Sequence, residues 1–316
     1  MKTLTRTTEN VHFYVDSRNQ PKLRVEPGES FRLETIRADN MFLNHSNPVF
    51  KDHKEVMQVQ ANPVTGPVYV ENAEPGDLLA VTIEDIRLGD SGNEGYYTYV
   101  PGQGVFANRF APEAFPPDTR FCDVSGKTLT LKLGNKKIET AVEPFIGTIC
   151  VAMKDKVTLS FEANREMVGN IDCSSVKKGC TMVMPVNVPG ALLSLGDLHA
   201  KQGDGELLGC AVESDGVVTL QAALIKKQDK GYFNWPHIDD DRYIGSVCTA
   251  PNNIEEAIRG ATYDIIKRVE ADGNIPFMDA YMLAGQCLRI RICQMITGAC
   301  TAYAFLERNL VESLRR

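Results

Sequence analysis

Short runs of alternating or β-branched residues follow one another through the first 250 residues, and each run ends at a turn sequence. The turns are rich in Gly, Pro, Asn and Asp, as in Gly-Pro-Val-Tyr-Val-Glu-Asn-Ala-Glu-Pro-Gly-Asp at 66–77. This spacing of strands and turns is typical of a β-sandwich or a β-barrel. The expected strands lie at 11–15, 68–70, 79–83, 129–133, 157–161 and 217–224.

The pattern changes after residue 250. Asn253 is a helix N-cap followed by two glutamates, and apolar residues recur at helical spacing from Ile254 to Val269, so we expect a helix that ends at Gly273. A short helix over 278–286 and an alternating strand from residue 288 should follow. We therefore predict a mainly β fold, sandwich-like or barrel-like, with an α+β C-terminal part. Its domains would be a β-rich region over 1–250 and an α+β region over 251–316 packed on it.

Residues 89–118 show no periodicity and are rich in Gly, Tyr, Asn and Pro. Their aromatic side chains need a surface to pack on, so this stretch is expected to be a long ordered loop or lid. Loops of this kind often carry function.

The composition is that of a soluble globular protein, with 43% hydrophobic and 24% charged residues. A total of 34 Lys and Arg against 41 Asp and Glu gives a net charge of −7, which disfavours nucleic acid as a partner. No apolar window approaches the roughly 18 residues of a membrane span. The first residues lack the apolar run of a secretory signal, and the nine cysteines lack CxxC pairing. We expect a cytoplasmic protein with reduced thiols and no membrane contact.

The densest group of chemically active side chains lies within ten residues. Its members are Asp197, His199, Gln202, Asp204 and Glu206. Two-residue spacing on an extended backbone points side chains to one face, so Asp197 and His199 should face the same way. Imidazole and carboxylate ligands together suit a divalent metal, which can polarise a carbonyl and activate water. The competing interpretation is a pair of turns with capping Asp residues and a half-buried, structural histidine.

Residues 169–213 resemble the signature region of the acetamidase/formamidase family. The motifs are Gly-Asn-Ile-Asp from residue 169 and Gly-Asp-Leu-His-Ala-Lys-Gln-Gly-Asp-Gly-Glu from residue 196. Further matches lie at 62–77, 144–147 and 279–283, so the resemblance covers most of the chain. The motif positions carried over are Asn170, Asp172, Asp197, His199, Gln202, Asp204, Glu206 and Glu213.

The resemblance implies a β-rich homo-oligomer, a dimer or larger, that hydrolyses short aliphatic amides such as formamide or acetamide. The products would be ammonia and a carboxylate. It also implies a divalent metal, with zinc favoured and calcium as the alternative. Our hypothesis places Asp172, Asp197 and His199 on the metal. Glu206 would be either a further ligand or the base, and Glu206 or Asp204 would transfer the protons.

Asn170 and Gln202 are assigned to substrate binding. The segment 34–42, Glu-Thr-Ile-Arg-Ala-Asp-Asn-Met-Phe, is more basic and apolar than in many family members. Two alternatives therefore stay open: an amidase-family lactamase with a different amide substrate, and a non-catalytic β-sandwich that binds a small molecule or a metal.

A nucleophilic mechanism is the remaining alternative, with Cys173 as the thiol nearest the motif and Ser174 and Ser175 beside it. A reactive thiol needs a lowered pKa and a neighbouring base, whereas nine thiols in apolar stretches indicate buried, inert cysteines. The sequence has no GxSxG elbow. His45 and His237 could reach a site from their loops, although exposed turns are the simpler interpretation.

Overall fold

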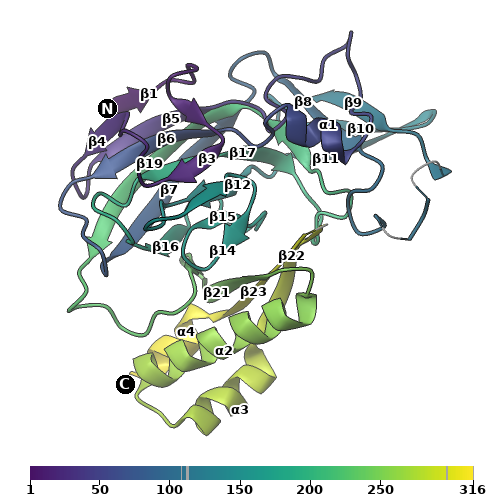
Figure 1. Cartoon of the computed structure of the whole chain (residues 1–316). Coiled ribbons are helices and arrows are strands. Elements are labelled where there is room, and N and C mark those ends of the chain that lie inside the picture. The colour runs from purple at the N-terminus through teal and green to yellow at the C-terminus, as the bar shows by residue number, and fades with distance from the viewer. Residues whose placement is uncertain (108, 112–113, 297, 316) are drawn as a thin grey trace.

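Two large β-sheets and a group of C-terminal helices make up this computed structural model, which describes residues 1–107, 109–111, 114–296 and 298–315 (Figure 1). The strands dominate and the long helices lie next to the C-terminus. This confirms the predicted mainly β fold with an α+β C-terminal part. Among the described residues, no helix is both long enough and apolar enough to cross a membrane.

The first sheet has nine strands. Alternation along β19 shows how it forms, because Val218, Leu220 and Ala222 are buried while the residues between them are partly exposed. In spatial order the strands are β1 (Lys2–Leu4), β5 (Ser30–Thr35), β19 (Gly216–Ile225), β7 (Leu78–Leu88), β16 (Thr181–Pro185), β20 (His237–Asp239), β21 (Tyr243–Ala250), β23 (Ala299–Glu307) and β22 (Arg289–Ile296).

The second sheet has ten strands and holds the polar motif. Its main path is β14 (Ala163–Asn164), β15 (Val168–Asn170), β12 (Phe145–Cys150), β17 (Leu193–Lys201), β18 (Val212–Ser214), β8 (Glu94–Tyr99) and β9 (Asp118–Asp123). Off this path, β6 (Val64–Val70) pairs with β17, β2 (Val11–His12) and β4 (Leu23–Val25). Two small pairs complete the strands: β10 (Thr128–Leu133) with β11 (Lys136–Ala141), and β3 (Tyr14–Asp16) with β13 (Val157–Leu159).

The main hydrophobic core lies between the two sheets. Phe31 and Leu33 of the first sheet and Ile146 and Leu195 of the second belong to one cluster of fully buried side chains. Complete burial of a side chain of this size stabilises the fold by about 1.5–3 kcal/mol. The strands that carry the motif are therefore held on a rigid base.

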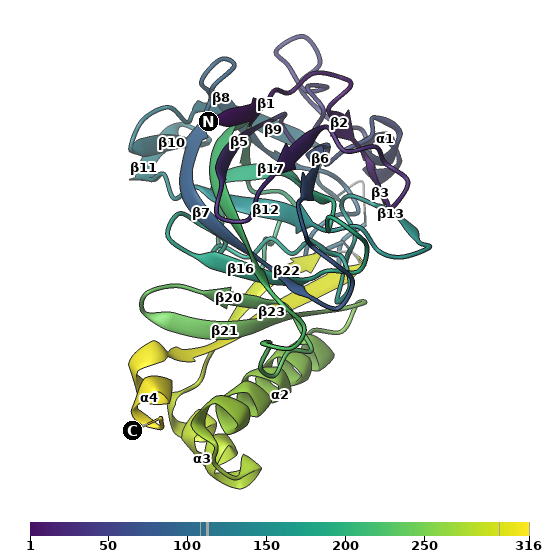
Figure 2. The same cartoon turned by 90° about the vertical axis from the view of Figure 1, so that its left-hand side faces the viewer.

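Helices α2 (Ile254–Gly273), α3 (Phe277–Cys287) and α4 (Arg308–Ser313) pack on the part of the nine-stranded sheet that contains β21 and β23, whereas α1 (His53–Gln58) lies near β8 (Figure 1). The predicted long helix is α2, in which the Asn253 side chain accepts a hydrogen bond from the Glu256 N–H, and the left-handed Asn274 ends it. Its Ile265 and Val269 pack against strands β21 and β23 (Figure 2).

The expectation of a continuous loop at 89–118 is wrong in its first part, because Glu94–Tyr99 form β8. The pairing is long-range: Tyr96 is buried and lies opposite Glu213 of β18. Gly95 permits this approach, since a Cβ atom there would lie 2.6 Å from the Glu213 carbonyl oxygen. The division at residue 250 remains a prediction, and strands β22 and β23 extend the sheet that the first region forms.

Candidate active site

Four neighbouring strands bring the polar side chains together: β15, β12, β17 and β18. Their register sets Thr148 opposite Asn170, and His199 opposite Glu213. Asp197 lies on β17 two residues before His199. Residues that are far apart in the sequence thus become neighbours on one patch of the sheet.

Three carboxylate residues of this patch have left-handed backbones. The φ angles are 47° at Asp172, 58° at Asp197 and 47° at Glu206. Such conformations cost free energy in non-glycine residues and often mark functional sites. Asp197 lies within β17, and its Oδ1 lies 3.2 Å from Nε2 of His199. The expectation that these two side chains face the same way is confirmed.

Gly147 of β12 provides the space for two of the carboxylates. A Cβ atom at this position would overlap Oδ2 of Asp197 and lie 2.7 Å from Oδ1 of Asp172. The Gly147 carbonyl also accepts hydrogen bonds from the backbone N–H groups of Ile171 (3.1 Å) and Asp172 (3.2 Å). Only a residue without a side chain can form this floor.

Two neutral side chains hold Asp197. Oδ2 of Asp197 accepts hydrogen bonds from the Thr148 hydroxyl (3.2 Å) and from Nδ2 of Asn62 (3.2 Å). Both donors also bond Oδ1 of Asn170. Asp197 is 3% exposed, so this network replaces the water that would otherwise solvate its charge.

Some carboxylate oxygens of the cluster are left without a donor. Nδ2 of Asn170 donates to Oδ2 of Asp172 (2.9 Å), whereas Oδ1 of Asp172 is buried with no hydrogen-bond partner among the described residues. Oε2 of Glu213 lies 3.3 Å from Nε2 of His199 but forms no hydrogen bond within the described chain. Buried, unsatisfied carboxylate oxygens are the ligand type that a divalent cation accepts.

Burial and mutual repulsion raise the pKa values of two carboxyl groups in the cluster. Burial raises the pKa of Glu206 to about 8, with the charges of Glu213 and Asp197 adding to the effect against the opposing charge of His199. Burial also raises the pKa of Asp172 well above its usual range, reinforced by Glu206 and Asp197. These two carboxyl groups therefore hold a proton more tightly than an exposed carboxyl does.

His199 and Asp197 form the charged pair within this cluster. Burial opposes a charge on His199, but the carboxylates of Glu213 and Asp197 raise the pKa of the imidazole well above its usual value. Burial also opposes a negative charge on Asp197. The positive charge of His199 and its hydrogen bond outweigh this effect, so the pKa of the Asp197 carboxyl is lowered. Burial raises the pKa of Glu213.

The donor set fits a divalent metal. Asp172, Asp197 and His199 offer ligand atoms within 4.8 Å of one another, and so do His199, Glu206 and Glu213. All five residues are buried. One imidazole with oxygen donors suits zinc, and the excess of carboxylates also suits harder ions.

A pocket opens directly onto this cluster. It has a volume of about 200 Å³, and Asn170, Asp197, Glu206 and Glu213 line its polar side. Apolar side chains, including Phe50 and Val56, also line the pocket. Ligand pockets for drug-sized molecules are typically about 300–1,000 Å³, so this one suits a smaller molecule.

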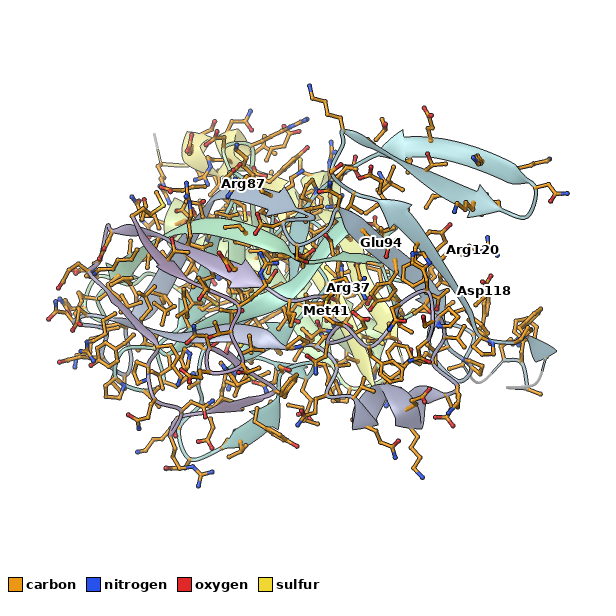
Figure 3. All side chains as sticks on the ribbon, turned by 90° about the horizontal axis from the view of Figure 1, so that it is seen from above. Arg37, Met41, Arg87, Glu94, Asp118 and Arg120 are labelled. Atoms are coloured by element: carbon orange, nitrogen blue, oxygen red, sulfur yellow. The ribbon has the colours of Figure 1, made fainter. Side chains whose placement is uncertain are left out.

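One wall of the pocket is the early segment 38–62, and a buried ion pair stiffens its start. Nε of Arg37 donates to Oδ1 of Asp39 (3.0 Å), and Nη2 donates to Oδ2 of Asp39 (2.8 Å). The guanidinium also lies over the Tyr96 ring, 5.1 Å from its centroid. In the view of Figure 3, Arg37 and Met41 lie near the middle, and Glu94 of β8 is labelled above and to the right of them.

The structure brings most of the predicted site residues together, although it leaves their roles untested. Asn170, Asp172, Asp197, His199 and Glu206 share one buried cluster. Asp204 stands apart, because its side chain is 61% exposed and pairs with Arg291. Gln202 contacts the far side of the His199 ring, with Oε1 2.9 Å from Nδ1.

Sequence reasoning missed Gly147, Thr148 and Asn62, and it gave Glu213 no role. Gly147 and Asn62 stand at the ends of two of the matched segments, 144–147 and 62–77, so their positions carried a signal without a function attached. Thr148 had no such signal. Its importance comes from the pairing of β12 with β15 and β17.

The thiol in the pocket is Cys210 rather than Cys173. Cys173 is fully buried. Burial and the charge of Glu213 raise the pKa of Cys210 well above its usual value, so its sulfur stays protonated. His45 is exposed and pairs with Glu94, whereas His237 is buried against Asp264, so the interpretation of His237 as part of an exposed turn is wrong.

A family model described as the Acetamidase/Formamidase family matches residues 3–164 and 151–295. The chain belongs to the acetamidase/formamidase family. Its relatives include a formamidase of Methylophilus methylotrophus, 28% identical over 255 residues, which covers 66% of this chain and 62% of the relative. An acetamidase of Mycolicibacterium smegmatis is 29% identical over 257 residues, 64% of this chain and 63% of the relative.

This family member spans about three fifths of the length of the curated relatives it matches. A solved structure of similar size is the acetamidase from Bacillus halodurans. It superposes with a TM-score of 0.88 at 28% identity, covering 99% of both chains. The acetamidase/formamidase fold therefore extends over the whole of the described chain.

Proposed function

We propose that this chain hydrolyses short aliphatic amides to ammonia and a carboxylate. The observation that carries the proposal is the pocket of about 200 Å³ whose polar lining includes Asn170, Asp197, Glu206 and Glu213. The names of the related formamidase and acetamidase supply the substrate class. The apolar side of the pocket suits a short alkyl chain.

A divalent metal, with zinc ahead of calcium, belongs to the proposal. Asp172 and Asp197 would hold it through carboxylate oxygens, and His199 through Nε2. The bound ion would supply Lewis-acid chemistry, polarising the amide carbonyl and making water more acidic. Glu213 faces the same imidazole nitrogen, and its unsatisfied oxygen is available as a further ligand.

Glu206 is the residue that we assign to proton transfer. Its carboxyl group lines the pocket, and its pKa of about 8 lets it hold a proton near neutral pH. In its deprotonated form the Glu206 carboxylate can accept a proton from the attacking water, and the carboxyl so formed can deliver that proton to the departing nitrogen. Asp204 is less suited, because it is exposed and paired with Arg291.

Asn170 lines the pocket, but its amide is already engaged by the protein. Its Oδ1 accepts from Asn62 and Thr148, and its Nδ2 donates to Asp172. This arrangement supports a role for Asn170 in orienting Asp172 as well as the assigned role in substrate binding. Cytoplasmic location and assembly into a homo-oligomer remain part of the proposal, and the nine cysteines are all free thiols, which agrees with a reducing compartment.

The test is ammonia release from formamide, acetamide and propionamide, with ring opening of a γ-lactam measured beside it. One preparation is assayed as purified, after chelation, and after zinc or calcium is restored. We expect turnover of a linear amide that chelation abolishes and metal restores.

Each other outcome contradicts a stated part of the proposal. Turnover of the lactam alone would make the chain a lactamase. The absence of any turnover with metal bound would make it a binding protein. Activity that survives chelation and is lost on thiol alkylation would replace the metal with a thiol nucleophile.

A further inference from the structure

We propose that Gln202 is a positioning residue that sets the orientation and tautomer of His199, and that it does not contact substrate. The inference rests on the proposed metal site, because the orientation of His199 determines which imidazole nitrogen faces the metal. The geometry of the Gln202 side chain and of strand β22 carries it.

Two backbone carbonyls fix the Gln202 amide. Its Nε2 donates to the carbonyl oxygens of Asp172 (2.8 Å) and Cys293 (2.9 Å). Carbonyl oxygens only accept hydrogen bonds, so the NH₂ end of the amide must point at them. The oxygen Oε1 is thereby turned toward His199.

The amide orientation decides the state of the imidazole ring. Oε1 of Gln202 lies 2.9 Å from Nδ1 of His199 and can only accept, so Nδ1 carries the hydrogen. The other nitrogen, Nε2, faces Oδ1 of Asp197 (3.2 Å) and Oε2 of Glu213 (3.3 Å). When a metal ion displaces the hydrogen on Nε2, the lone pair of this nitrogen would point toward the carboxylates that share the ion. Partners of this kind are what orient metal-binding histidines.

Strand β22 holds the whole segment in place. The strand has an irregular register between Ile292 and Gln294, and Cys293 lies at that point. Gly205 donates its N–H to the Ile292 carbonyl (2.8 Å), and Met295 donates its N–H to the Gly205 carbonyl (2.8 Å). Hydrogen bonds to strand β22 thus anchor the loop 202–206.

The location of Gln202 separates positioning from substrate contact. Within the described part of the chain, the pocket lining includes Asn170, Asp197 and Glu206 but not Gln202. Gln202 approaches His199 from the side away from the carboxylates, since Nδ1 and Nε2 lie on opposite sides of the ring.

The decisive variant is Gln202→Met, which keeps the length of the side chain and removes its hydrogen bonds. Zn²⁺ affinity is measured by competition with a chromophoric chelator, and the His199 ring nitrogens are followed by ¹⁵N NMR, assigned with a His199→Asn variant. We expect the zinc Kd to rise by about 10–100-fold and the His199 ring signals to shift. Gln221→Met, at a half-buried glutamine in β19, serves as the matched control and should change neither.

The outcomes separate this inference from the proposed function. If the wild-type protein binds no zinc, the metal site itself is wrong. If the wild type binds zinc and Gln202→Met keeps the Kd within threefold with unchanged His199 signals, Gln202 is not a positioning residue. A raised KM for amide with an unchanged zinc Kd would return Gln202 to substrate binding.

A second variant covers loss of folding in the first. Gln202→Glu keeps an acceptor for the Nδ1 hydrogen and removes the donor to the two carbonyls. We expect it to retain the Nδ1–H signal of His199 and to bind zinc more tightly than Gln202→Met. Loss of the Nδ1–H signal in Gln202→Glu, with thermal unfolding still cooperative, overturns the proposal.

Discussion

Arg291 holds Asp204 at the protein surface, with Nε of the arginine 3.1 Å from Oδ1 of the aspartate. Glu206, only two residues further along the chain, points the other way and lines the pocket. The two acidic residues of the Gly-Asp-Gly-Glu motif therefore have different environments, one solvated and one 6% exposed. We therefore expect the two residues to have different roles.

Replacement of Glu206 by Gln should stop proton transfer while preserving shape. We expect kcat to fall by about 10²–10⁴-fold, the size of a general acid–base contribution. The KM for amide and the zinc content should change little, because the side chain volume is kept. Ammonia release under saturating amide, together with metal analysis, measures both quantities.

Asp204→Asn is the matched control for that experiment. It alters a neighbouring carboxylate of the same motif whose partner is Arg291, so kcat should stay within about threefold. A large loss of kcat in Asp204→Asn with normal turnover in Glu206→Gln would exchange the two assignments.

Gly147→Ala tests the floor of the site. The new methyl group would overlap Oδ2 of Asp197 and press on Oδ1 of Asp172, so these carboxylates must shift. Overpacking of this kind costs about 1–3 kcal/mol in the free energy of unfolding, and we expect zinc affinity to fall with it. Urea unfolding and a zinc titration measure the two effects.

Gly285→Ala provides the comparison, because Gly285 lies in α3 and a Cβ atom there meets nothing within 4 Å. That substitution should raise the free energy of unfolding by about 0.5–1 kcal/mol. Equal behaviour of the two alanine variants would show that the space over Gly147 is not needed.

Cys210→Ser should retain amide turnover within a few fold. Cys210 lines the pocket, but burial and Glu213 raise its pKa, so it supplies no thiolate near neutral pH. A serine keeps a donor toward Oε1 of Glu213, the atom 3.6 Å from the present sulfur. Steady-state kinetics of the purified variant decide the matter, and a loss of three orders of magnitude would favour a thiol nucleophile.

Stability should fall in mild acid because of His12. Burial lowers the pKa of His12 from 6.5 in the unfolded chain to about 4, and the nearby charge of Lys22 adds to this against a hydrogen bond with Gly66. The unfolded state therefore binds a proton first as the pH falls below 6.5, and the folded state is penalised increasingly until pH 4. Over that window His12 should cost up to about 3 kcal/mol in the free energy of unfolding.

The measurement is urea unfolding of the wild type and of His12→Gln between pH 7 and pH 4. The difference between the two profiles isolates His12 from the other groups that titrate. His45→Gln, at an exposed histidine, should follow the wild-type profile. Parallel profiles for wild type and His12→Gln would contradict the assigned pKa.

The sequence predicted helices α2 and α3 because their signals are local, whereas it gave no indication of α1 or α4. Asn253 and Gly273 bound α2 as the capping pattern indicated. Two-residue spacing likewise placed Asp197 and His199 in one cluster. Both predictions depend only on residues that are close together in the sequence.

Other parts of the site depend on contacts between distant segments, which one sequence does not reveal. Asn62 bonds Thr148 and Asp197, which are 86 and 135 positions away. Strand β8 has no local signature, because its tyrosines and glycine become strand residues only by pairing with β18 and β9. The surface position of Asp204 depends on Arg291, which follows it by more than eighty residues.

The pocket joins two kinds of surface that come from separate stretches of the chain. Its carboxylate side comes largely from residues 170–213, while much of the remaining lining comes from 38–62 and 96–104. An exchange of those two earlier stretches that kept Asn62, which donates to Asp197, and Tyr96, which pairs with Glu213, would leave the carboxylates of the cluster in place. Selectivity in this chain can therefore change by replacement of a wall, while the reaction chemistry is inherited intact.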